Sequence, residues 1–408
     1  AEAIAPDIQP VVNSDELVDI NWPLEEIASD QFQIAGGWGG GTFVGSVGVT
    51  LNNLSIKNFF KKGAWRPYPM GQNQRLSISA QTNGTYYKAF AISFTDPWMG
   101  GRKPNSFTIS AHYSDENNAY YAWQKGTRYF RTAGVAAGLG KRLDWPDPYF
   151  TFYAEASYER YMLKDWNTFV LKNGAANLLS IRLVLGRNSV DQPIYPRRGS
   201  DFSVSVQLTP PYSLWDGKDY KSTALSEQER YNWIEFHKWM LKGQWFTPLT
   251  RNGNLVLMAR AEMGYLGHYN KNKVSPFERF EVGGDGMTGY NMYGIDIISM
   301  RGYDDGALDP VGSNYSCAYN KYTMELRYPL LLKGQTNIYV LGFLEGGNGF
   351  TSWKEFSPFK IKRSAGIGVR LFLPVVGMVG VDWGWGFDPA AGQTKRLSLI
   401  HISEPTRP

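Results

Sequence analysis

The chain has 408 residues, a formal net charge of +5 and one cysteine, and it contains 25 Tyr, 22 Phe, 14 Trp and 44 Gly. The aromatic content excludes a disordered chain, the dilute charge does not support a nucleic-acid partner, and the lone Cys317 excludes an internal disulfide framework and a thiolate zinc cluster. The longest near-apolar stretch, 371–381, is too short for a membrane-spanning helix, whereas transmembrane β-strands suit this composition.

The first 28 residues contain one short strand signal, 16–22, which ends before Pro23. This segment is too short to form a domain alone, so we expect 1–28 to be the end of a domain whose beginning is absent. Residue 1 is Ala, and no signal peptide precedes it, although a barrel of an outer membrane needs one for export. We therefore expect the sequence to be a mature form or a fragment.

Alternation of apolar and polar residues with a period of two dominates the rest of the chain. Within 254–265, Leu255 and every second residue after it are apolar or aromatic, whereas Arg260 and Glu262 fall on the other face. An apolar face suits lipid and a charged face suits a wet lumen, so the pattern predicts an all-β transmembrane antiparallel β-barrel over 29–390. A soluble β-sandwich or propeller also alternates, but its strands are usually shorter, and no repeat of propeller period occurs.

The predicted barrel strands number about fifteen, and many are long enough to cross a membrane. Their predicted bounds are 31–40, 42–53, 72–82, 85–95, 105–114, 126–140, 149–163, 177–188, 200–209, 236–247, 254–267, 316–328, 336–346, 363–373 and 376–387. Several connections after even-numbered strands are short, and those after odd-numbered strands include the long segments 115–125, 210–235, 268–315 and 347–362. Short turns at one rim and long loops at the other are typical of an outer-membrane barrel.

Two local signals refine the long-loop rim. Asn83 and Gly84 form a tight hairpin signal, which makes this connection an exception on that rim. The sequence S-E-Q-E at 226–229 is a capping-box pattern, so the loop before the tenth predicted strand is expected to carry a helical turn.

Motifs for catalysis or metal binding do not emerge from the sequence. There is no nucleophile elbow, P-loop or C-x-x-C pattern. The four histidines lack metal-ligand spacing; they are His112, His237, His268 and His401. The glycine run 36–41 misses the G-x-G-x-x-G pattern because Thr42 occupies the last position, and it is interpreted as a flexible hairpin. Carboxylates on a lumen face are normal in barrels, so we expect no enzyme, no metal and no cofactor.

The segment 268–315 is far longer than an ordinary connection, so it should be functional or disordered. Its apolar residues, such as Phe277, need a surface to pack against, and the lumen is the surface that a barrel offers to a loop. Near its far end, Arg301 needs anionic partners in such a partly dry site. The inward faces of the flanking strands supply Glu325 and Glu345. The alternative is that Arg301 is a solvated loop tip and both glutamates are ordinary lumen residues.

Several motifs resemble the BamA family of outer-membrane assembly proteins. The sequence M-R-G-Y at 300–303 resembles the family's (V/I)-R-G-(F/Y) loop motif. The sequence F-L-E-G-G at 343–347 resembles its F-x-D-x-G strand motif, with Glu in place of Asp, and 324–329 resembles the preceding strand, where the family has an inward Glu. The resemblance implies a lock that holds the loop in the lumen, formed by Arg301, Gly302, Tyr303, Glu325, Phe343, Glu345 and Gly347.

The resemblance extends from about residue 15 to 388. The sequence V-D-I-N-W at 18–22 resembles the last strand of the final POTRA domain, so 1–28 is expected to be the end of that domain. The glycine run resembles the first barrel hairpin. The family's seam lies between the first and last strands, and the first-strand residues of that seam would be Gly36, Gly37, Trp38, Gly39 and Gly40.

The family resemblance implies a sixteen-strand barrel in the bacterial outer membrane that folds and inserts other β-barrel proteins through its seam. The implied partners are unfolded outer-membrane proteins as clients, outer-membrane lipids, and accessory lipoproteins that bind through the absent POTRA domains. No nucleotide, metal or nucleic acid is implied. The R-G-Y motif is shared across the superfamily, so a two-partner secretion pore or another protein-translocating relative stays open as the alternative, with a plain porin or an outer-membrane enzyme as the third hypothesis.

The last residues depart from the family pattern. After Asp388 the family has a loop and a final strand with an aromatic end, whereas this chain carries Pro405 and Pro408 and has no terminal aromatic residue. The string from Leu397 resembles translated sequencing-adaptor read-through. We expect 391–408 to be a non-native tail and the true final strand to be missing; the alternative is a short strand at 397–402.

Overall fold

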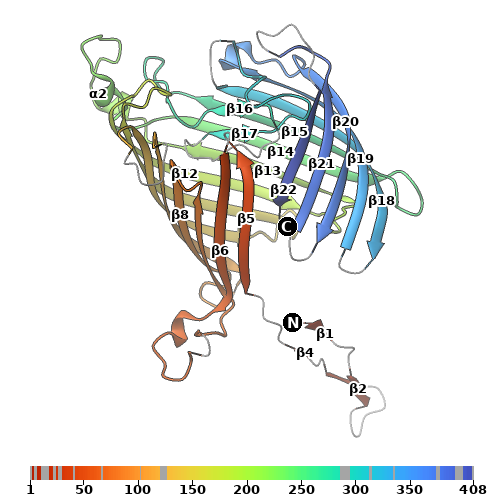
Figure 1. Cartoon of the computed structure of the whole chain (residues 1–408). Helices are drawn as coiled ribbons and strands as arrows, with labels where there is room; N and C mark the ends of the chain where they lie inside the picture. The colour runs from red at the N-terminus through yellow and green to blue at the C-terminus, as the bar shows by residue number, and fades with distance from the viewer. Residues whose placement is uncertain are drawn as a thin grey trace.

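The computed structural model shows a sheet that curls around a lumen, with long loops at the upper rim and the short N-terminal strands below the lower rim (Figure 1). The structure describes residues 2–3, 7–10, 18–21, 24–25, 30–39, 42–65, 68–101, 103–119, 126–284, 295–311, 315–333, 336–373, 377–390 and 398–406.

One antiparallel sheet of sixteen strands forms the wall, and each of its strands pairs with its neighbours in chain order. In that order the strands are β5 (Gln31–Gly39), β6 (Thr42–Leu54), β7 (Gln74–Thr82), β8 (Tyr87–Asp96), β9 (Asn105–Asn117), β10 (Tyr129–Arg142), β11 (Phe150–Lys164), β12 (Gly174–Asn188), β13 (Gly199–Leu208), β14 (His237–Pro248), β15 (Val256–Gly267), β18 (Ala318–Lys333), β19 (Thr336–Phe350), β20 (Lys362–Leu373), β21 (Gly377–Gly386) and β22 (Ser398–Thr406). The two ends of the sheet are β5 and β22, and both are drawn toward the viewer in Figure 1.

The N-terminal segment forms two small paired units outside the wall. β1 (Glu2–Ala3) pairs with β4 (Leu24–Glu25), and β2 (Asp7–Pro10) pairs with β3 (Val18–Asn21). The strand predicted at 16–22 is therefore present as the shorter β3. Its assignment to a POTRA domain stays a prediction.

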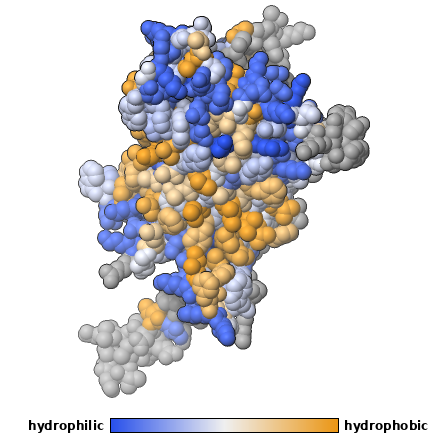
Figure 2. All heavy atoms as spheres, turned by 90° about the vertical axis from the view of Figure 1, so that its left-hand side faces the viewer, coloured by the Kyte–Doolittle hydropathy of each residue, from blue (hydrophilic) through white to orange (hydrophobic). Residues whose placement is uncertain are grey.

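The wall reverses the burial pattern of a soluble protein. In β18, Met324 is 49% exposed and Leu326 is 48% exposed, whereas the alternate residues Glu325 and Arg327 are buried. This alternation confirms the period that the sequence predicts, with apolar side chains outside and charged side chains facing the lumen. Figure 2 shows apolar side chains gathered over the middle and lower part of one face of the wall, below a polar upper part. None of the helices in the described part of the chain has the length and apolarity needed to span a membrane.

The two rims differ in their connections as the sequence predicts. The upper rim carries the connections 209–236 and 268–317. Within the first of these, α1 (Tyr212–Trp215) precedes α2 (Glu227–Tyr231), whose predicted capping box is present because Ser226 Oγ accepts from the Glu229 N–H and Glu229 Oε2 accepts from the Ser226 N–H. Most lower-rim connections are short, and they are 97–104, 143–149, 189–198, 249–255, 334–335 and 374–376. The exception on that rim is 55–73, which includes a 3₁₀ turn, η1 (Ile56–Asn58).

The final strand departs from the predicted tail. β22 pairs with β21, with Ser398 opposite Trp385, so the sheet has one strand more than the predicted fifteen. This favours the alternative of a short strand, with bounds 398–406. The sequence argument relied on Pro405, but an edge strand tolerates a residue without an N–H. The pairing is irregular between Met378 and Gly380, next to the place where Pro405 lies.

The long loop 268–317 folds into the lumen near the upper rim, as the sequence predicts (Figure 1). β16 (Phe280–Val282) and β17 (Asp296–Ile298) form a parallel pair within it. The buried side chains of the loop pack with inward-facing aromatic residues of the wall in one cluster, which includes Phe130, Tyr161, Phe277, Phe280, Met300, Tyr303 and Tyr319. Residues 285–294 and 312–314 of this loop lie outside the described residues.

Candidate functional site

Residues 300–303 form a tight turn that the loop holds with its own backbone. The Met300 N–H donates to Gly284 O (2.8 Å), and the Gly284 N–H donates to Tyr303 O (3.0 Å). Gly302 has φ of 87°, and a Cβ at this position would lie 3.0 Å from the backbone nitrogen of Gly386 in β21. The left-handed backbone and the close approach to β21 both require glycine at 302. The turn therefore lies directly against the backbone of a wall strand.

The Arg301 guanidinium lies among carboxylates from three strands. Its Nη2 is 2.7 Å from Glu325 Oε1 on β18 and 2.7 Å from Glu345 Oε1 on β19. Its Nη1 is 3.5 Å from Asp382 Oδ2 on β21. Glu345 also accepts from the Arg301 backbone N–H at 2.9 Å and from its Nε at 3.0 Å. Charge-assisted and paired contacts of this kind fix both position and orientation, so Glu345 is the main acceptor of the lock.

A second cation lies near each of these three carboxylates. The pairs are Arg327 with Glu325 at 2.7 Å, Arg370 with Asp382 at 2.6 Å, and Lys321 with Glu345 at 3.9 Å. All three carboxylates are buried. Buried charges are costly unless they are paired, and here each is paired on more than one side. Removal of one cation would therefore affect the three carboxylates unequally.

The remaining predicted lock residues complete the contact surface. Arg301 Cζ lies 3.7 Å from the ring centroid of Phe343, which is a cation–π arrangement. The Tyr303 hydroxyl donates to the backbone oxygens of Arg363 (2.8 Å) and Asp388 (3.2 Å). A Cβ on Gly347 would lie 2.7 Å from the Asn320 carbonyl oxygen and 3.5 Å from Met300 Sδ, so this position has no room for a side chain.

The structure thus brings all seven predicted lock residues into one site. The alternative of a solvated loop tip is not what the structure shows, because the Arg301 side chain is 11% exposed. The sequence reasoning missed Asp382, although alternation between Val381 and Trp383 in β21 places it on the inward face. Its role as a partner depends on how far the loop reaches across the lumen, which no local pattern reports.

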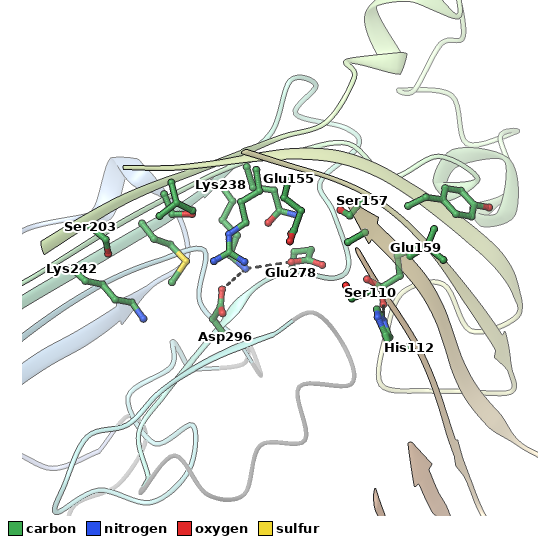
Figure 3. A pocket seen from close by; sticks show the side chains of 18 residues that line it. Ser110, His112, Glu155, Ser157, Glu159, Ser203, Lys238, Lys242, Glu278 and Asp296 are labelled. Atoms are coloured by element: carbon green, nitrogen blue, oxygen red, sulfur yellow. Dashed lines mark hydrogen bonds and ion pairs between the residues drawn. The ribbon is translucent and has the colours of Figure 1, made fainter. Parts of the chain in front are cut away.

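A second charged contact joins the wall to two segments of the loop, one around Glu278 and one around Asp296, and the sequence reasoning also missed it. Lys238 on β14 lies 2.6 Å from Asp296 Oδ2 and 3.4 Å from Glu278 Oε2, so one wall lysine binds both limbs of the loop (Figure 3). The Tyr161 hydroxyl on β11 donates to Glu278 Oε1 at 3.1 Å. Glu278 has φ of 65°, a strained value for a residue with a side chain. Burial raises the pKa of the Glu278 carboxyl to about 7, against the opposing effect of Lys238.

A polar cavity of about 500 Å³ lies beside this contact. Charged side chains of both signs line it: Glu155, Glu159 and Lys242 are labelled in Figure 3, and Arg182 is a further lining residue. The lumen beside the loop is therefore polar and charged, which is the interior expected of a transmembrane barrel.

The predicted seam residues lie in β5, which is the first strand of the sheet and one of its two ends. Gly36, Gly37, Trp38 and Gly39 belong to β5, where Gly36 is opposite Gly45 of β6. Gly40 lies outside the described residues. Two opposed glycines offer no cross-strand side-chain contact, so the pairing at this position depends on backbone hydrogen bonds alone.

Solved structures with a similar fold include one BamA protein and two CdiB proteins. BamA from Haemophilus ducreyi lacking POTRA domains 1–3 matches with a TM-score of 0.62 and 16% identity, over 98% of this chain and 75% of that chain. CdiB from Escherichia coli matches with a TM-score of 0.56 and 12% identity, over 98% of this chain and 66% of that one. CdiB from Acinetobacter baumannii gives 0.55 and 13%, over 98% and 64%. These likenesses establish the fold.

Sequence comparison agrees with the structural likeness. The outer membrane protein assembly factor BamA of Neisseria meningitidis serogroup B is 23% identical over 343 residues, which are 79% of this chain and 35% of that protein. The chain thus spans about a third of the length of this curated relative. The model of the Omp85 superfamily domain matches residues 70–399. The chain therefore belongs to the Omp85 superfamily, as a β-barrel of the bacterial outer membrane.

Proposed function

We propose that this chain folds and inserts β-barrel proteins into the outer membrane through a seam between β5 and β22. The observation that supports this function is the arrangement of the sheet ends: β5 pairs with β6, β22 pairs with β21, and neither has a second partner strand among the described residues. An edge strand presents unpaired N–H and C=O groups. In lipid each unpaired group costs several kcal/mol, so an incoming client strand gains by pairing there.

The composition of β5 suits reversible pairing. Its glycines add backbone hydrogen bonds but no side-chain packing, which weakens a strand relative to one with β-branched residues. A client strand with larger side chains would compete for the same edge. Folding of the client supplies the free energy, so no nucleotide is needed.

The lumen lock would hold the strands next to β22, on the other side of the seam from β5, in a fixed position. Arg301 joins the loop to β18, β19 and β21, and β21 is the strand on which β22 pairs. A client that pairs with one edge of the sheet therefore meets a wall that the loop supports. The proposed partners are unfolded outer-membrane proteins, the surrounding lipids, and accessory lipoproteins that act through POTRA domains.

Site-specific photo-crosslinking tests the seam. A photoreactive residue replaces Phe32 of β5, which is 65% exposed, and the matched control replaces Ile181 of β12, which is 55% exposed on the same outer surface. The chain is reconstituted in liposomes and receives an unfolded small barrel protein. We expect a client adduct from position 32 and a much weaker one from position 181. Equal adducts, or none from position 32 while the client folds, would contradict the proposal.

A protein-translocating pore of the same superfamily is the second candidate. The two CdiB structures share the fold of this chain, and this likeness supports a pore as well as it supports an assembly factor. The polar cavity offers an aqueous route beside the loop. A photoreactive residue at Lys242, which lines that cavity, separates the two functions. A translocating pore gives adducts with the passing chain at 242, whereas an insertion seam gives them at 32.

A further inference from the structure

The connection between β6 and β7 is an exception on a rim that otherwise carries short turns. It spans 55–73, and its residues 55–65 and 68–73 are described. Long connections in a compact barrel are usually functional. In Figure 1 it projects below β6, beside the edge of the sheet, and bends away from β1 and β2. The segment therefore lies outside the lumen lock and has no part in the contacts described so far.

Hydrogen bonds hold this connection in a defined conformation. Ser55 Oγ donates to Gln72 Oε1 (2.9 Å), the Ile56 N–H donates to Gln74 Oε1 (2.9 Å), and Asn58 Nδ2 donates to Met70 O (3.1 Å). These hydrogen bonds thus join the two ends of the loop, as in a compact Ω-loop. They therefore fix the two ends of the loop relative to each other.

The tip presents aromatic side chains to the outside. Phe60 is 91% exposed and Trp65 is 54% exposed. Phe59 packs edge-on against both rings, with centroid distances of 5.3 Å to Phe60 and 5.1 Å to Trp65, and Trp65 Nε1 donates to Phe59 O at 3.0 Å. A preformed aromatic cluster that stays exposed marks an interaction site, because folding alone would bury it.

The charge of the same loop has one sign. Lys57, Lys61 and Lys62 are exposed, and the sequence 55–73 contains no Asp or Glu. Basic residues interleaved with Phe and Trp are typical of protein segments that lie in the interface of an anionic bilayer. The loop also continues the apolar outer surface, since Val49 of β6 and Ile56 at the loop's start are both exposed. The neighbouring surface is thus the apolar outer surface that faces lipid in a transmembrane barrel.

The loop is fastened to the first strand of the seam. The Tyr68 hydroxyl donates to both oxygens of Asp30, at 2.6 and 2.7 Å, and the Asn52 N–H donates to Asp30 Oδ1 at 3.0 Å. Asp30 directly precedes β5. Whatever the loop binds is therefore held next to the base of β5.

In outer-membrane barrels the rim with the short turns faces the periplasm. We infer that residues 57–65 of this loop dock on the anionic phospholipid surface of the periplasmic leaflet, with Phe60 and Trp65 at the acyl-chain boundary and the three lysines at the headgroups. Docking there would disturb lipid order beside the first strand of the seam. An effect of this lipid disorder on client entry rests on the proposed assembly function, whereas the docking of the loop on the membrane does not.

Depth-dependent fluorescence quenching tests the docking without any client. Because Cys317 is the single cysteine of the chain, Phe60→Cys in a Cys317→Ser background takes one environment-sensitive dye. The matched control is Asp144→Cys, an exposed position in the lower-rim turn 143–149. The chain is reconstituted in vesicles of phosphatidylcholine with or without phosphatidylglycerol, and some preparations contain lipids brominated along the acyl chain. Both orientations in the vesicle report equally, because quenching comes from the lipid.

We expect several-fold stronger quenching at position 60 than at position 144, and an increase with phosphatidylglycerol content that Lys57→Gln, Lys61→Gln and Lys62→Gln together abolish. Quenching at position 60 no greater than at position 144 would overturn the inference. So would a blue-shifted dye at position 60 that brominated lipid does not quench, since that result means that protein, and not lipid, covers the loop tip. Neither result would bear on client crosslinking at the seam.

Discussion

Arg301→Ala is the substitution that most directly tests the lumen lock. The change removes the guanidinium from among Glu325, Glu345 and Asp382 and leaves the backbone N–H of residue 301 in place. The three carboxylates are not affected equally. Glu325 keeps Arg327, and Asp382 keeps Arg370.

The loss therefore falls on Glu345. Its remaining side-chain partners are Thr323 Oγ1 at 3.2 Å and Lys321 at 3.9 Å. Breaking a buried ion pair by removal of one partner costs about 3–5 kcal/mol, and the remaining partners place this case near the lower value. A loss of about 3 kcal/mol in loop docking corresponds to roughly a hundredfold larger undocked fraction. The stacking of Arg301 on Phe343 is lost as well.

Limited proteolysis with chymotrypsin measures this undocking, because the loop carries Phe and Tyr sites and the substitution creates none. The cleavage rate of 268–317 is compared with that of Arg251→Ala, a control in the exposed turn 249–255. Seminative electrophoresis checks that the barrel itself stays folded. We also expect fewer folded clients in reconstituted liposomes, in proportion to the undocked fraction.

A double substitution decides whether the cause is the unpaired carboxylate. Glu345→Gln removes that charge, so in the background of Arg301→Ala it should recover part of the loss, with a coupling of about 0.5–3 kcal/mol. Wild-type cleavage rates in Arg301→Ala, or effects of the two substitutions that simply add, would refute the reasoning.

Three further expectations concern the turn and the second contact. Gly302→Ala should undock the loop although it removes no charged group, because the new Cβ would meet the backbone of β21 and a φ of 87° disfavours alanine. Faster chymotrypsin cleavage of the loop would show this undocking, and an unchanged cleavage rate would contradict the packing argument. Lys238→Met should cost about 3 kcal/mol, because it leaves the buried Glu278 and the partly exposed Asp296 without their cation. Faster hydrogen exchange around both residues would show this loss, and Lys238→Arg should recover most of it. Burial in the docked loop raises the pKa of Glu278 to about 7, so the docked loop binds this proton more tightly than the undocked chain does. Docking should therefore weaken as the pH rises from about 4.5 to about 7, by at most roughly 3 kcal/mol. The measurement is the chymotrypsin cleavage rate of the wild-type loop divided by that of Glu278→Gln at each pH, and a ratio that does not change with pH would exclude this titration.

Sequence alternation predicts the wall well because each strand repeats one rule. The inward position of Glu325 and the outward position of Met324 follow from the period of two, and the structure confirms both. The position of the loop follows from its length and its apolar residues, since a barrel has one place to bury them. What neither pattern supplies is the partner across the lumen. Asp382 and Lys238 are each an ordinary inward charge in a strand, and only the path of the loop makes them contacts.

The last strand shows a different limit. Pro405 and the lack of a terminal aromatic residue are arguments about family pattern and strand propensity, and both are weak at the edge of a sheet. There, a strand needs hydrogen bonds on one side only, and β22 obtains them from β21 despite an irregularity beside the proline. Backbone pairing therefore outweighs composition at this position.

The two edges of the sheet differ in how mechanical load would pass through them. In the described part of the chain, the ion pairs that join the long loop to the wall reach β14, β18, β19 and β21. A pull on β22 is transferred through β21 to Gly302 and Arg301, and from there across the lumen to Lys238 on the middle of the wall. A pull on β5 is carried by its pairing with β6, where Gly36 faces Gly45, and at its base by the hydrogen bonds of Asp30 with Tyr68 and Asn52, so no contact among the described residues carries it across the lumen. The barrel should therefore peel from its glycine-rich edge, with the opposite edge braced as a fixed support.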